Sequence, residues 1–139
     1  MNSNNTDNSV KTFTIDLLTL QPSQLYINVD KLRKVESEYK LKKLFDPLPV
    51  KLLNERIILT DGHTRALTYY LNSIYSIEVY WDDPWGSEFL DKEEYEIAVQ
   101  WCLDESIFSI KDLENRIITN DEYQFLWLER CQKMHETLK

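Results

Sequence analysis

Apolar and polar residues change their spacing several times along the chain, and each spacing predicts a different element. Over residues 11–20 the apolar side chains alternate with polar ones, which predicts a first strand. Residues 29–44 are charged but place Leu32, Val35 and Tyr39 on one side of a helix. The chain therefore opens with a strand followed by a charged helix.

The middle of the chain predicts a hairpin. Pro47 and Pro49 force extended backbone on the residues before them and exclude a helix there. Two short apolar runs follow, over 50–53 and 56–60, separated by two polar residues. This arrangement is typical of two strands joined by a tight turn at 54–55.

A second helix is predicted over residues 64–74, and a strand with alternating apolar positions over 75–81. The helical spacing favours one apolar face, and Asn72 and Ser73 are typical of a helix end. The residues on that face are Ala66, Leu67, Tyr70, Leu71 and Ile74.

A third helix is indicated by start signals near residue 91. Asp91 and Glu94 have capping-box spacing, and Leu90 and Tyr95 are placed as a hydrophobic staple. The apolar face of this helix continues through Tyr95, Ala98, Val99 and Cys102.

The same signature recurs at Thr119 and Glu122, flanked by Ile118 and Tyr123, after a short helix predicted over 109–117. An apolar stripe then favours burial of one side of the last helix, with a partner-binding face as the alternative. The stripe consists of Tyr123, Trp127, Cys131 and Met134.

The order of elements predicts an α+β fold with a small mixed β-sheet and a helical C-terminal layer. We expect a disordered tail at residues 1–9, a sheet-containing domain over 10–88, and a helical extension over 89–139 that packs on it.

The charge is uneven. The chain of 139 residues has a formal net charge of −8, yet residues 31–56 contain eight basic and four acidic side chains. Residues 78–139 contain six basic and sixteen acidic ones. An anionic ligand is therefore expected to bind the first half, unless its basic residues only form a solvated helix face. The acidic total makes DNA an unfavourable partner.

Two cysteines, Cys102 and Cys131, lie in predicted helices without a disulfide framework, which favours free thiols in a reducing compartment. No apolar run has the length of a membrane span. We expect a cytoplasmic protein that does not enter a membrane.

The stretch "LTDGHTRAL", residues 59–67, places a glycine turn between a predicted strand and a predicted helix. The first N–H groups of a helix lack intrahelical partners and carry partial positive charge, so they attract anions. Gly62 permits close approach of a ligand, Thr64 adds a hydroxyl, and Arg65 adds a cation suited to phosphate. An imidazole has an unperturbed pKa of about 6.5, so His63 is expected to donate or accept a proton near neutrality.

An alternative for the same turn is purely structural. Asp61 can cap the helix by accepting a hydrogen bond from the N–H of His63 or Thr64, with Gly62 serving only the turn. The residues alone leave both interpretations open.

Other candidate sites are weaker. Glu78 with Asp82 and Asp83 is a conceivable metal site, but acids in a turn are usually only solvated, and no zinc spacing exists. Trp81 and Trp85 could stack on a base. Cys131 and His135 are four residues apart, but the end of a chain is a poor place for a catalytic base. We predict no metal site.

Residues 13–82 resemble the ParB/sulfiredoxin superfamily in the order of their elements. "DPLPVKLLNERIILTDGHTRALTYYLNSIYSIEVYW" contains a proline-led strand, a hairpin, an Asp-Gly-His-x-Arg turn, a helix and a strand. The helical remainder resembles that of small bacterial ParB-like proteins. The resemblance implies nucleotide phosphate binding by Gly62, His63, Thr64 and Arg65.

The turn departs from two branches of that superfamily. Sulfiredoxins have Gly-Cys-His-Arg, whereas this chain lacks the attacking thiol. Partition ParB proteins have Gly-Glu-Arg-Arg, and here only Gly62 and Arg65 match. Neither sulfinic-acid reduction nor chromosome partition is the expected activity.

The turn is most similar to Asp-Gly-His-His-Arg of the free serine kinases, which implies catalytic roles for Asp61 and His63, with ATP, ADP or CTP and Mg²⁺ as cofactors. Thr64 replaces the second histidine, and Gln24 stands where the kinases have an acid. Glu36 or Glu38 could take the place of that acid, although nothing in the sequence shows it. Whether the chain is an enzyme stays open.

We therefore expect binding of a nucleotide or another phosphorylated small molecule at Asp61–Arg65, with phosphotransfer as an extension. The alternatives are a non-catalytic protein-interaction module, with a protein partner or homodimer formed through the C-terminal helices, and a DNA-partition-associated protein.

Overall fold

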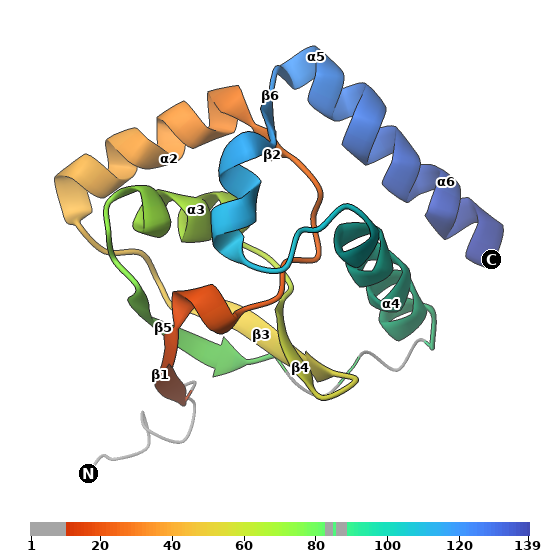
Figure 1. Ribbon diagram of the computed structural model, residues 1–139, viewed down its shortest axis with the longest axis horizontal. Helices are drawn as coiled ribbons and strands as arrows, with labels where there is room; N and C mark the ends of the chain where they lie inside the picture. Colours follow the sequence, from red (N-terminus) through yellow and green to blue (C-terminus); the bar gives the residue numbers. More distant parts are fainter. Residues whose placement is uncertain (1–10, 83–84, 86–88) are drawn as a thin grey trace, which may run out of the picture.

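The computed structural model describes residues 11–82, 85 and 89–139 (Figure 1). Its centre is a four-stranded mixed sheet in the order β1 (Thr12–Asp16), β5 (Ser76–Trp81), β3 (Leu48–Leu53) and β4 (Arg56–Leu59). Strand β5 pairs antiparallel with β1 and parallel with β3, while β3 pairs antiparallel with β4. The predicted α+β class with a small mixed sheet is confirmed.

The predicted hairpin is present between β3 and β4. Leu53 pairs with Arg56, so the turn contains only the two residues between them. Asn54 and Glu55 have φ values of 49° and 68°. Positive φ at both central positions gives the turn a twist that matches the twist of the flanking strands.

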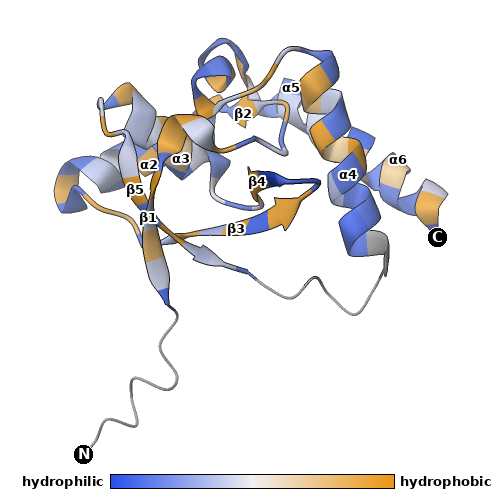
Figure 2. Ribbon diagram, turned by 60° about the horizontal axis from the view of Figure 1, so that its bottom comes forward, coloured by the Kyte–Doolittle hydropathy of each residue, from blue (hydrophilic) through white to orange (hydrophobic). Residues whose placement is uncertain are grey.

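Helices α2 (Val29–Lys42) and α3 (His63–Leu71) lie side by side on one side of the sheet (Figures 1 and 2). Leu32, Val35 and Tyr39 are the buried residues of α2, as the spacing predicts.

The predicted apolar face of α3 is partly wrong. Its buried apolar residues are Ala66, Leu67 and Tyr69, whereas Leu71 and Ile74 are each 36% exposed. The helix ends at Leu71, so the 3.6-residue period does not extend to Ile74.

Residues beyond β5 are mostly helical. They form α4 (Phe89–Asp104), a 3-10 turn η2 (Ile110–Asn115), the short strand β6 (Ile117–Ile118), and α5 (Asn120–Tyr123). A π-helical turn η3 (Gln124–Leu128) joins α5 to α6 (Glu129–Leu138). The three form one continuous helix, which we call the C-terminal rod (Figure 1). A 3-10 turn η1 (Leu17–Thr19) and strand β2 (Ile27–Asn28) complete the N-terminal part.

The two predicted capping boxes have different outcomes. Thr119 and Glu122 form theirs, with each side chain accepting from the other's backbone N–H. Asp91 does not cap α4, because the helix begins two residues earlier, at Phe89. The Leu90 side chain lies outside the described residues, as do the predicted tail at 1–9 and Asp83.

The helix predicted over 109–117 is shorter than expected. It is the 3-10 turn η2, which has a capping box formed by Ser109 and Asp112. Ile117 lies beyond the end of η2 and belongs to strand β6. Strand β6 pairs in parallel with β2 through Ile27 and Ile117, which are 90 residues apart in sequence. Such a distant pairing leaves no local sequence signal.

The C-terminal layer shares the core of the sheet-containing part. One cluster of buried side chains joins Leu48, Leu59 and Leu67 to Ile110 and Trp127. In the part of the chain that the structure describes, no helix has the length and apolar character needed to cross a membrane.

Candidate functional site

The turn between β4 and α3 is built around Gly62. Its φ of 82° lies in the left-handed region, where L side chains are strained. A Cβ atom at this position would lie 2.9 Å from Leu48 Cδ2, so packing against β3 also favours glycine. The turn therefore depends on Gly62 for both its backbone and its packing.

Asp61 does not cap α3, so that part of the structural alternative is wrong. Its carboxylate accepts from the N–H of Gly62 at 2.8 Å, and Gly62 is itself the N-cap residue. The first helical hydrogen bond is donated by Ala66 to the Gly62 carbonyl. No side chain among the described residues caps the N-terminus of α3, which leaves the N–H groups of His63 and Thr64 to a ligand or to water.

A pocket of about 490 Å³ lies between α2 and the start of α3. We call it the α2–α3 pocket. The turn contributes Asp61, Gly62, Thr64 and Arg65 to it, and α2 contributes further residues, of which the sequence analysis named Glu38 as a possible kinase acid. The α2 residues are Asp30, Lys31, Lys34, Val35 and Glu38.

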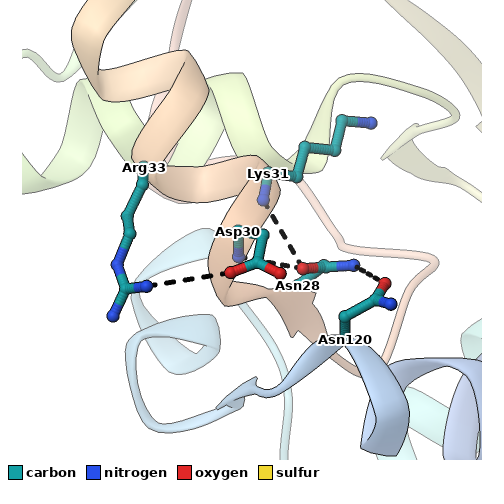
Figure 3. A network of polar contacts seen from close by, with 5 residues as sticks. All are labelled: Asn28, Asp30, Lys31, Arg33 and Asn120. Carbon is teal, nitrogen blue, oxygen red and sulfur yellow. Dashed lines mark hydrogen bonds and ion pairs between the residues drawn. The ribbon is translucent and has the colours of Figure 1, made fainter.

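The basic side chains of α2 are directed differently. Figure 3 shows Lys31 and Arg33 leaving the helix on different sides. Arg33 lies 3.7 Å from Asp30 and does not line the pocket, whereas Lys31 does. Three cationic side chains line the pocket, those of Lys31, Lys34 and Arg65. The carboxylates of Asp30, Glu38 and Asp61 balance their charge.

The start of α2 is fixed by Asn28. Its side-chain oxygen accepts from the N–H of Asp30 at 2.9 Å, and its amide nitrogen donates to Asn120 of α5 at 2.9 Å (Figure 3). One side chain thus caps α2 and joins it to the C-terminal rod, which holds Lys31 in place beside the turn.

His63 lies apart from the other residues of the turn. Its side chain is only 3% exposed and does not line the α2–α3 pocket. Its Nε2 atom accepts a hydrogen bond from the backbone N–H of Ser23 at 3.0 Å. Burial, reinforced by the positive charge of Lys31 and partly opposed by Asp61, lowers the pKa of His63 to about 4. The imidazole is therefore neutral near pH 7, and its hydrogen bond with the Ser23 N–H joins the turn to the segment that contains Ser23.

This burial predicts a pH effect on stability. The pKa of His63 is about 4 in the folded protein and about 6.5 when the chain is unfolded, so the unfolded state binds more protons between these values. The contribution is fully present above pH 6.5 and is lost as the pH falls towards 4, by roughly 3 kcal/mol in total. We expect urea unfolding of a His63→Gln variant to lose this part of the pH dependence, and imidazole ¹⁵N shifts to show His63 neutral at pH 5.5. A protonated His63 at that pH would contradict the prediction.

The residues that could replace a kinase acid are separated by the fold. Glu38 lines the α2–α3 pocket, whereas Glu36 does not. Gln24 is also outside it. The Gln24 amide nitrogen donates to the Tyr26 carbonyl and to the Tyr123 hydroxyl.

The weaker candidates gain no support. Glu78 accepts from the hydroxyls of Thr14 and Thr12, which lower its pKa. Burial raises the pKa of Cys131 to about 11, and His135 contacts Glu94 at 2.9 Å. Over residues 11–82, 85 and 89–139, no group of three acidic, histidine or cysteine side chains is arranged to hold a metal ion.

The basic residues of 31–56 do not form one surface. Lys51 is buried against the Asp82 carbonyl and the ring of Trp85, and Arg56 donates to Gln21. The remaining basic residues lie on α2 and at its end. This division separates the cations of the pocket from the rest.

Comparisons with known proteins show likeness in fold only. No model of a known protein family and no curated protein sequence matches the chain. The solved structure of protein Atu1540 from Agrobacterium tumefaciens matches with a TM-score of 0.54 and 16% identity, over 74% of this chain and 61% of that one. A Pnob8-like ParB-N domain matches with a TM-score of 0.47 and 13% identity, over 67% of this chain and 37% of that one.

The similar structures thus include a ParB N-terminal domain, at low identity. The chain spans about three fifths of the length of Atu1540. These likenesses concern the fold, and the chemistry of the site has to be argued from its own residues.

Proposed function

We propose that the α2–α3 pocket binds a phosphorylated small molecule, with a nucleotide such as ATP, ADP or CTP as the first candidate. The phosphate would lie against the N–H group of Thr64 at the start of α3, flanked by Lys31, Lys34 and Arg65. This proposal keeps Gly62, Thr64 and Arg65 in the binding roles expected from the sequence. It assigns His63 a positioning role in place of proton transfer, because its side chain is buried away from the pocket.

One observation supports the proposal above the others. Two lysines of α2, about thirty residues earlier in sequence, line the same pocket as the uncapped start of α3. A helix start, a guanidinium and two ammonium groups together form the kind of site that stabilises phosphate. The carboxylates beside them leave the pocket without a net charge, so the ligand is recognised by local geometry and not by a general positive field.

Phosphotransfer is a second candidate, and the position of Asp61 favours it. Asp61 is exposed and lines the pocket, as Glu38 does, so either carboxylate is placed to accept a proton from an attacking hydroxyl. Mg²⁺ is usually held by one or two carboxylates together with substrate phosphates, so Asp61 and Glu38 fit a phosphate-bound ion and not a dedicated metal cage. Bound Mg²⁺ would neutralise charge on the phosphates.

Calorimetry with ATP, ADP and CTP, with and without Mg²⁺, tests the binding. We expect Arg65→Ala and Lys34→Ala each to weaken the best ligand by roughly 1.5–3 kcal/mol, the usual contribution of a charge-assisted hydrogen bond. The measured quantity is the dissociation constant, which should rise by about tenfold or more.

Lys40→Ala is the matched control. Lys40 is exposed on the same helix and lines none of the pockets described here, so its loss should change the affinity little. The proposal fails if no nucleotide binds more tightly than about millimolar, or if Lys40→Ala weakens binding as much as Lys34→Ala. Transfer of phosphate to an added hydroxyl compound, lost in Asp61→Asn, would establish the second candidate.

A further inference from the structure

A second cavity, of about 280 Å³, lies on the other side of the Asp61–Arg65 turn. We call it the C-terminal cavity, because α4, η3 and α6 form much of its wall. Thr60 and His63 line it from the turn, while none of its lining residues belongs to the α2–α3 pocket. The turn therefore separates two cavities of different composition.

The polar groups of this cavity are mainly acceptors. The Asp91 side chain makes no hydrogen bond or ion pair among the described residues. Glu94 contacts His135 through Oε1, and its other carboxylate oxygen has no partner in that part of the chain. The Gln24 amide nitrogen is bonded, but its oxygen has no partner in that same part of the chain. No Lys or Arg is among the described residues that line the cavity.

His63 supplies a donor to the same cavity. Because Nε2 accepts from Ser23, the neutral ring must carry its proton on Nδ1. Among residues 11–82, 85 and 89–139, Nδ1 has no hydrogen-bond partner, although His63 is only 3% exposed. Nδ1 is not among the fully buried atoms that lack a partner, and His63 lines the cavity, so a ligand there can accept a hydrogen bond from the Nδ1–H.

The rest of the wall is apolar and aromatic. Trp127 and Met134 line it from the C-terminal rod, and Tyr95 lines it from α4 while donating its hydroxyl to the Thr60 carbonyl. Trp127 lies in the π-helical turn η3, and such turns are frequent at functional sites. Aromatic faces beside carboxylates suit a cation carried on an apolar body.

We propose that the C-terminal cavity binds a small primary ammonium ion on a compact apolar body that also carries one hydrogen-bond acceptor. The ammonium group lies against Asp91, Glu94 and Gln24 Oε1, and the acceptor receives the Nδ1–H of His63. A carboxylate on the ligand would find no cation in the wall. This inference does not depend on phosphate binding in the α2–α3 pocket.

Four probes of one shape test the chemistry by calorimetry on the full chain. Tyramine has both required groups, tyrosol replaces the ammonium with a hydroxyl, phenethylamine lacks the phenol oxygen, and tyrosine adds a carboxylate. We expect tyramine to bind best. The dissociation constant of tyrosol should be at least about tenfold higher than that of tyramine, and that of phenethylamine about two- to tenfold higher. Tyrosine should also bind more weakly than tyramine.

Variants of α4 test the position. Asp91→Asn and Glu94→Gln should each weaken tyramine about fivefold or more, whereas Glu96→Gln, the same charge change at an exposed position on that helix, should have little effect. The Asp91 side chain makes no hydrogen bond or ion pair among the described residues, so the Asp91→Asn variant keeps the test valid if Glu94→Gln disturbs His135.

Imidazole ¹⁵N spectra give a second measurement, because the chain has only two histidines. Tyramine should shift the His63 ring nitrogens, and phenethylamine should shift them less. Arg65→Ala should leave tyramine affinity unchanged, which separates this site from the α2–α3 pocket. Equal binding of tyrosol and tyramine, equal loss in Glu96→Gln and Asp91→Asn, or no binding of tyramine at about 10 mM would overturn the proposal.

Discussion

A chain that ends at residue 88 should fail to fold cooperatively, although it contains the whole four-stranded sheet. Ile107, Ile110 and Leu113 are between 0% and 1% exposed and belong to the same core cluster as the sheet residues. Burial of one such side chain contributes about 1.5–3 kcal/mol, so losing these alone approaches the 5–15 kcal/mol that typically stabilises a domain. The truncation also removes β6, the pairing partner of β2.

Circular dichroism during urea titration and the dispersion of amide NMR signals measure this outcome. The matched control is a chain that ends at residue 135, which loses only the last turn of α6 and should unfold cooperatively. A cooperative transition in the chain that ends at 88 would show that residues 10–88 are an independent domain, as the sequence-based domain boundary expects.

Replacement of Gly62 by alanine should lower the free energy of unfolding by roughly 2–5 kcal/mol. A left-handed backbone costs a non-glycine residue about 1–2 kcal/mol, and overpacking adds about 1–3 kcal/mol. Both apply, because φ is 82° and the new Cβ would lie 2.9 Å from Leu48 Cδ2. Equilibrium urea unfolding gives the difference directly.

Ser73→Gly is the matched control for the backbone. Ser73 has a φ of 61° without being glycine, so glycine there should leave stability unchanged or slightly raise it. If Gly62→Ala stays within about 0.5 kcal/mol of the wild type, the turn does not need glycine and the strained geometry is wrong.

Local sequence signals predicted the fold well wherever the structure depends on neighbours in sequence. The turn at Asn54 and Glu55 and the cap formed by Thr119 and Glu122 each involve residues within four positions of one another, and both are present. Strand β6 was missed, because a two-residue strand is defined by its partner, and Ile27 lies 90 residues away from Ile117. The start of α4 was placed at Asp91, two residues too late. The same capping pattern can occur within the first turn of a helix and directly before it, so the sequence does not distinguish the two positions.

The site was predictable in part for the same reason. The turn residues Gly62, Thr64 and Arg65 do line one pocket, as their adjacency suggested. Lys31, Lys34 and Glu38 complete it from α2, and their three- and four-residue spacing was the signal that they share a helix face. Nothing in the sequence revealed that this face lies against the turn, or that His63 is directed away from its neighbours, because both depend on how α2 and α3 pack.

The parallel pairing of Ile27 with Ile117 has a consequence for how the protein folds during its synthesis. Parallel strands so far apart in the chain must close a long loop before their contacts stabilise anything, and such topologies fold slowly. Until the ribosome has added residues 110–118, β2 has no partner and the core lacks Ile110 and Leu113. The nascent chain therefore exposes apolar surface until these residues are made, and the N-terminal strand β2 becomes native only after them.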